Sequence, residues 1–162
     1  MAFLLNLDKK LAAGEAVIIG VLLLIMSVFA FLQVLTRYCF SFSIIWCEEI
    51  TRYCMIWMTF IGTAFAVSKQ EHINIDMMTE WVKNKTGFDL RHILNILIFI
   101  FAIFCVYYGF NLVVSTAASG QQTPALRLPM YWVYLIMELS LLLTAFHAFV
   151  RVIDFKINGK DK

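Results

Sequence analysis

Four apolar stretches, each about long enough to cross a lipid bilayer, constrain this chain more than any other feature. The first, Ala16 to Leu35, holds 20 residues without a charged side chain, and a membrane-spanning helix needs roughly 20 apolar residues. Of the 162 residues, 62% are hydrophobic and 15% are charged, whereas a soluble domain has about 25% charged residues. We therefore expect an all-α integral membrane protein, with residues 1–162 forming a single membrane domain.

The four spans are predicted at about residues 16–36, 44–68, 92–118 and 130–153. Pro129 suits the first turn of the last helix, because the N–H that it lacks would be unpaired there. The first apolar run is longer than the roughly 7–15 residues of a signal-peptide core. It is therefore expected to stay in the protein as a span.

Two amphipathic helices are expected to lie flat at the membrane surface. Residues 2–15 mix leucines with charged side chains, and residues 69–91 place apolar side chains at spacings of three and four. Both patterns are typical of helices in the interface plane. For the 69–91 segment, packing on a soluble partner is the alternative.

The basic residues predict the orientation of the chain. With four spans, both termini and the 69–91 loop lie on one side of the membrane. That side holds all thirteen Lys and Arg residues except Arg37, Arg52 and Arg127, which leaves ten. Positively charged loops stay in the cytoplasm, so both termini are expected to be cytoplasmic.

Cysteine spacing and net charge argue against two classes of function. There is no CxxC pair and no Cys/His cluster with zinc spacing. Cys47 and Cys54 are seven residues apart, so they share a helix face and are expected to be small packing residues. A net charge of +2 is too small to suggest nucleic-acid binding.

Charged side chains near the start of the second span are expensive in lipid and are therefore functional candidates. Arg52 lies six residues past Trp46, an expected interfacial anchor, or about 9 Å at 1.5 Å per residue. Glu138 lies eight residues past Met130, about 12 Å into the fourth span by the same rise. The two are expected to pair, because each is costly in a membrane without a partner.

A second group of polar side chains lies nearer the same surface. Arg37 is expected to pair with Glu48 or Glu49. The alternative is a Glu48–Arg52 pair within one helix, since these residues are four apart. Asn111 lies at a level from which it could join the deeper pair. One acidic side chain would then be left to face water or a partner chain.

Three interpretations of this outer cluster stay open. The cluster fixes helix register, it forms a proton or cation path in a self-sufficient small transporter, or it contacts another membrane subunit. The first is favoured because no acidic residue lies at the midplane. The cluster comprises Gln33, Arg37, Glu48, Glu49, Arg52, Asn111 and Glu138.

Histidines suggest another class of function, a haem-bearing membrane anchor. His92 and His147 lie at the same membrane edge on two different spans, and two such side chains can ligate a haem iron. Interfacial histidines bound to water or backbone are the commoner case. We expect no cofactor, and we find no arrangement of residues typical of an enzyme.

A set of motif residues between positions 37 and 76 resembles the DctQ-type small membrane subunit of TRAP (tripartite ATP-independent periplasmic) transporters. At one position the chain departs from the family pattern, since Glu71 stands where glycine is usual. The motif residues are Arg37-Tyr38, Trp46-x-Glu48-Glu49-x-x-Arg52-Tyr53, Trp57, Gly62 and His72-Ile73-x-Ile75-Asp76.

The resemblance implies a non-catalytic scaffold in the bacterial inner membrane. Its partners would be a large membrane subunit, which carries the substrate and sodium sites, and a periplasmic substrate-binding protein that delivers an organic acid such as a C4-dicarboxylate or sialic acid. Such a subunit has no known catalytic residue or cofactor. Membrane lipid would surround it.

Overall fold

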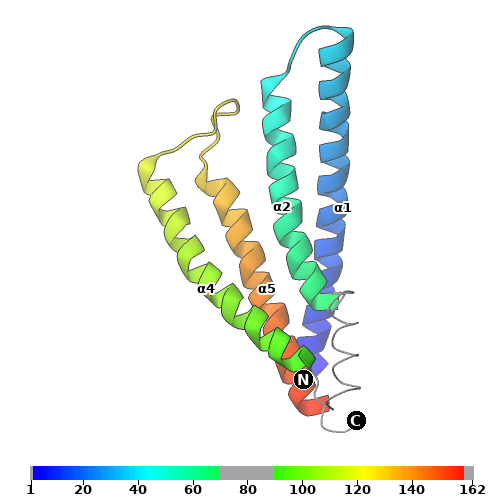
Figure 1. Cartoon of the computed structure of the whole chain (residues 1–162), viewed down its shortest axis with the longest axis vertical. Helices are drawn as coiled ribbons and strands as arrows, with labels where there is room; N and C mark the ends of the chain where they lie inside the picture. The colour runs from blue at the N-terminus through cyan, green and yellow to red at the C-terminus, as the bar shows by residue number, and fades with distance from the viewer. Residues whose placement is uncertain (1, 70–89, 159–162) are drawn as a thin grey trace.

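The computed structural model describes residues 2–69 and 90–158, which form four long helices (Figure 1). They are α1 (Ala2–Cys39), α2 (Ile45–Lys69), α4 (Leu90–Ser119) and α5 (Tyr131–Asn158). No strand occurs within these two ranges, and all four helices are long and apolar enough to cross a membrane. The predicted all-α class and the four spans are thus confirmed.

The N-terminal segment differs from the expected surface helix. Residues 2–15 and the first span form one uninterrupted helix, α1. The segment contains no proline, and its one glycine, Gly14, costs a helix only about 1 kcal/mol relative to alanine. Asp8 and Glu15, two turns apart on one face, are only 1% and 3% exposed. They make this segment part of the bundle instead of a separate surface element.

The second predicted surface helix lies outside the described residues. So do the motif residues His72, Ile73 and Asp76.

The helices stand side by side in a row, in the order α1, α2, α5, α4 (Figure 1). Among these four described helices, α2 packs against α1 and α5, α4 packs against α5 alone, and α1 meets α5 near the chain termini. In α5, 44% of the most apolar stretch is buried, against 6% in both α1 and α4. The two edge helices therefore present most of their apolar surface outward.

We call the end with residues 40–44 and 120–130 the loop end, and the opposite end the termini end. At the loop end, Gly120 closes α4 in a left-handed conformation (φ 63°), as expected for a glycine just past a helix. Pro129 directly precedes α5, and its carbonyl accepts the Trp132 N–H at 3.2 Å. Both boundaries follow the sequence signals.

The buried stripe of α2 confirms the packing role predicted for two cysteines. Cys47 and Cys54 are 0% and 4% exposed. The Trp57 indole on the same helix donates a hydrogen bond to the Val133 carbonyl at 3.3 Å, which links α2 to α5.

Candidate functional site

Glu49 anchors the loop between α4 and α5. Its Oε2 accepts hydrogen bonds from the backbone N–H groups of Ala125 at 2.8 Å and Leu126 at 2.9 Å. Its Oε1 accepts the Tyr53 hydroxyl at 2.6 Å. The side chain is buried, and hydrogen bonds to a carboxylate are the stronger kind. One residue of α2 therefore binds a loop that lies 76 positions further along the chain.

Glu48 and Arg52 pair with each other on the outside of α2. Arg52 Nη2 lies 2.9 Å from Glu48 Oε1, and both side chains are 61% exposed. This pair within one helix is the predicted alternative to a pair between Arg37 and one of the two glutamates. Both acidic residues of the second span therefore have a partner inside the chain.

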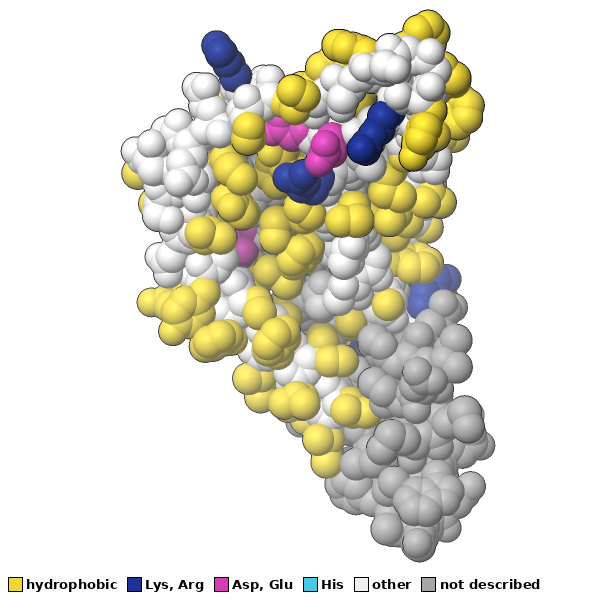
Figure 2. All heavy atoms as spheres, turned by 45° about the horizontal axis from the view of Figure 1, so that its top comes forward, with side chains coloured by type: hydrophobic (Ala, Val, Ile, Leu, Met, Phe, Trp, Pro, Cys, Tyr) yellow, Lys and Arg dark blue, Asp and Glu magenta, His cyan; other side chains and the backbone are white. Residues whose placement is uncertain are grey.

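The other expected members of the outer cluster do not join it. Arg37 is exposed and makes no ion pair with any residue that the structure describes. Trp46 meets Phe29 of α1 edge-on, with ring centroids 5.8 Å apart. The Asn111 amide donates to the Tyr107 carbonyl within α4. Figure 2 shows acidic and basic side chains gathered toward the loop end, with hydrophobic side chains over the flank below.

The expected Arg52–Glu138 pair is wrong. Two residues at the same expected depth can still point in different directions around their helices. Arg52 points away from the neighbouring helices, one position before the buried Tyr53, and binds Glu48 instead. An expected Arg37–Glu48 or Arg37–Glu49 pair fails for the same reason.

Glu138 instead lies between α5 and α4, against Gly109. It is 7% exposed, and its Oε1 has no hydrogen-bond partner among the described residues. Its Oε2 lies where a Cβ at position 109 would begin, so a larger residue there would force the end of the Glu138 side chain to move. The carboxyl group is thus buried without the partner that a carboxylate in a membrane needs.

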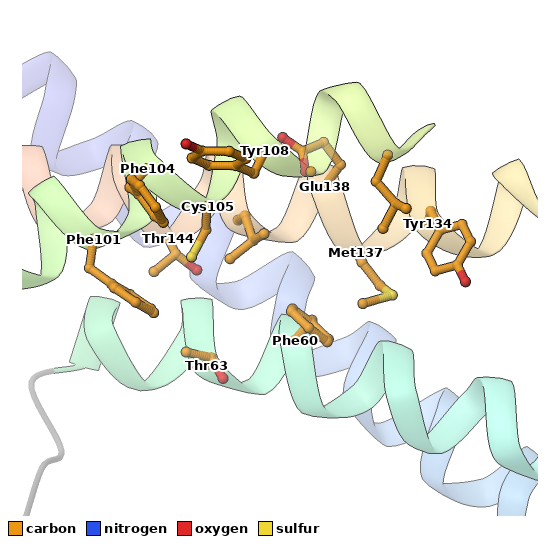
Figure 3. A pocket seen from close by; sticks show the side chains of 13 residues that line it. Phe60, Thr63, Phe101, Phe104, Cys105, Tyr108, Tyr134, Met137, Glu138 and Thr144 are labelled. Carbon is orange, nitrogen blue, oxygen red and sulfur yellow. The ribbon is translucent and has the colours of Figure 1, made fainter. Parts of the chain in front are cut away.

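A groove of about 500 Å³ runs past Glu138 between α2, α4 and α5. Figure 3 shows Phe60 and Thr63 of α2 across the groove from Phe101 and Phe104 of α4. Since α2 and α4 both pack on α5 and not on each other, α5 forms the floor of the groove. Its lining is almost entirely apolar apart from Glu138.

Gly109→Ala should be less favourable in the wild-type chain than in a chain that lacks the Glu138 side chain. Alanine in a helix gains about 1 kcal/mol over glycine, but in the wild-type chain the end of the Glu138 side chain must shift to make room, which offsets part of that gain. The three atoms nearest to an added Cβ all belong to Glu138. In a Glu138→Ala background, Gly109→Ala should therefore stabilise by about 1 kcal/mol. Unfolding in mixed micelles measures both effects, and equal effects in the two backgrounds would contradict the contact.

A buried ionic cluster ties α1 to α5 at the termini end. His147 is 0% exposed, with Nδ1 2.6 Å from Asp8 Oδ1 and Nε2 3.1 Å from Glu15 Oε1. Arg151, one turn further along α5, places Nη2 3.2 Å from Asp8 Oδ2 and also donates to the Ser68 carbonyl of α2. Three helices are thus joined through one set of charges.

The cluster rules out His147 as a haem ligand in this fold, because both ring nitrogens already face carboxylates. The side chain of His92 lies outside the described part of the chain. No observation therefore favours a haem anchor.

Sequence reasoning missed this cluster. Asp8 and Glu15 are seven residues apart and His147 and Arg151 are four apart, so each pair shares a helix face. The predicted orientation puts all four at the same membrane edge. That periodicity was the available signal, but residues 2–15 were assigned to a surface helix.

Comparison with known proteins places the chain beside components of one kind of transporter. The sequence model of the family described as "Tripartite ATP-independent periplasmic transporters, DctQ component" matches residues 26–155. The ectoine TRAP transporter small permease protein TeaB of Halomonas elongata is 23% identical over 139 residues, which is 86% of this chain and 72% of TeaB.

Two further relatives match over shorter stretches. The C4-dicarboxylate TRAP transporter small permease protein DctQ of Vibrio cholerae is 34% identical over 53 residues, 33% of this chain and 23% of that protein. The sialic acid TRAP transporter permease protein SiaT of Haemophilus influenzae is 29% identical over 77 residues. That match takes in 48% of this chain but only 12% of SiaT.

Proposed function

Because this chain belongs to the DctQ component family of tripartite ATP-independent periplasmic transporters, in which it is a small permease subunit, we propose that it braces a large transport subunit. In this proposal it carries no substrate itself. The importer is coupled to sodium and takes up an organic acid that a periplasmic binding protein delivers.

The observation that carries the proposal is that charges at both ends fasten the helices to one another. Glu49 holds the α4–α5 loop to α2, and the His147 cluster joins α5 to α1 and α2. A rigid row of helices suits a part that stays fixed while its partner moves.

The relatives support the partner and the substrate class. SiaT is a far longer permease protein in which the matching stretch is a small part, as expected if this chain works beside a large membrane subunit. The names of relatives refer to sialic acid and C4-dicarboxylates, which are carboxylates, and to ectoine. We propose a carboxylate substrate for this system as well.

Reconstitution into liposomes tests this function. With the binding protein and a sodium gradient, uptake should require this chain together with the large subunit. This chain alone should give no uptake. Uptake by the isolated chain, abolished by Glu138→Gln, would instead support a self-sufficient small transporter and contradict the scaffold.

We further propose that the protein lies in the bacterial inner membrane with both termini in the cytoplasm. Cys39 is exposed at the loop end, so a membrane-impermeant maleimide should label it in spheroplasts, and Cys39→Ser should abolish the labelling. Labelling of Cys39 only in inverted vesicles would reverse the orientation.

A further inference from the structure

The groove beside Glu138 is long enough to receive part of a helix. Its lining on α5 extends from Tyr134 to Thr144, a rise of ten residue steps or about 15 Å, which is close to three helical turns. α2 and α4 flank it, with α5 as the floor. A helix laid in this groove would bury apolar surface of all three helices at once.

Glu138 indicates which chemical group a helix in the groove must carry. Its Oε1 is buried without a hydrogen-bond partner within the described parts of the chain, and the rest of the lining is almost wholly apolar. Lipid acyl chains have no hydrogen-bond donor, and an unsatisfied polar group costs several kcal/mol in lipid. A second helix with a cationic side chain would satisfy the carboxylate, because buried charges in membranes pair with one another.

The position of Glu138 also limits the source of that cation. It lies seven residues into α5, about 10 Å from the start of the helix. The described basic residues nearest the loop end do not supply it. Arg52 is bound to Glu48 on the outer face of α2, and the exposed Arg37 and Arg127 form no ion pair with a described residue. A cation for Glu138 would therefore come from another molecule that enters the groove.

We propose that the groove receives a transmembrane helix of the large subunit, which presents a Lys or Arg side chain to Glu138. The proposal rests on the function proposed above, since it names the surface of this scaffold that the large subunit covers. Gly109 has a part in it, because the absence of a side chain there lets Glu138 lie at the groove wall.

Photocrosslinking in the intact complex tests the position of the helix. Benzoylphenylalanine replaces Phe104, which lines the groove, or Phe110, which lies on the same helix outside it. The two phenylalanines are similarly exposed, at 57% and 62%, so they form a matched pair. The residue at 104 should crosslink to the large subunit and the residue at 110 should not.

Each other result of this experiment contradicts the proposal. If the subunits copurify but 104 crosslinks only to lipid or to a second copy of this chain, the groove has another occupant, although the proposed function stands. If the subunits copurify and the residue at 110 crosslinks to the large subunit while the residue at 104 does not, the large subunit docks on another face. If the unmodified subunits do not copurify at all, the proposed function itself fails.

Substitution of Glu138 tests the chemistry. Glu138→Leu should weaken association with the large subunit at least tenfold, while the isolated chain unfolds no more easily than the wild type. Glu138→Gln keeps a hydrogen-bond acceptor and should weaken association less. Unchanged association in both variants would show that no cation reaches Glu138.

The cation is then located on the large subunit by mass spectrometry of the 104 crosslink. Glu138→Lys should abolish association, and an acidic substitution at the cation should restore it. Failure of every Lys or Arg near the crosslink to restore association would contradict the proposed pair.

Discussion

His147→Ala should destabilise the chain by about 3–5 kcal/mol, the usual effect of removing one partner from a buried ion pair. Asp8 and Glu15 are at most 3% exposed and both face the His147 ring. Without the ring, two carboxylates lose a shared partner in a site that solvent does not reach. Reversible unfolding in mixed micelles, followed by tryptophan fluorescence, measures the change.

Two control variants separate loss of the ion cluster from loss of volume. Leu142→Ala removes a large side chain that is 47% exposed on the same helix, and it should cost far less. Replacing Asp8, Glu15 and His147 together with leucine should recover much of the stability, because well-packed apolar residues often substitute for a buried ion cluster without loss. If His147→Ala and Leu142→Ala cost the same, the cluster does not hold α1 to α5.

Glu49→Ala should destabilise the chain by at least about 3 kcal/mol, because it removes three hydrogen bonds to a charged group, each of which contributes about 1.5–3 kcal/mol. The substitution removes the acceptor of the Ala125 and Leu126 N–H groups and of the Tyr53 hydroxyl. The loop at 120–130 should also become susceptible to proteolysis. Unfolding in mixed micelles and limited proteolysis measure the two effects.

The adjacent residue is a matched control for Glu49. Glu48 is also a glutamate on α2, but its side chain is 61% exposed and its partner Arg52 equally so. Exposed pairs contribute about 0.2–1 kcal/mol, so Glu48→Ala should have a small effect and leave the loop protected. Glu49→Gln, which keeps an acceptor oxygen, should lie between the two. Equal effects at 48 and 49 would show that the anchor is not specific.

The spans could be predicted because they depend on local signals. Runs of about 20 apolar residues mark the helices, and Pro129 and Gly120 mark two of their ends. The buried faces of α2 were also predictable in part, since Cys47 and Cys54 repeat at seven residues.

The pairing of charges could not be predicted, because it depends on the rotation of each helix about its axis. Arg52 and Glu138 each lie seven residues into their helix, yet Arg52 points outward and Glu138 points toward Gly109. The order of the helices in the row decides which faces meet, and depth arithmetic carries no information about that order. The contact between Asp8 and His147 joins residues 139 positions apart, so it too needed the tertiary arrangement.

Distances between two spin labels in the reconstituted complex test the central claim, that this chain is a fixed brace, most directly. The labels occupy cysteines introduced at Ser43, before α2, and at Gln121, after α4, with Cys39 and Cys105 replaced by serine; both label sites are exposed. The distance distribution should be the same without ligand, with sodium, and with sodium and the substrate-loaded binding protein. A substrate-dependent shift of about 5 Å or more, the size of a one-turn slide between packed helices, would show that the row of helices moves with the large subunit and would contradict the account.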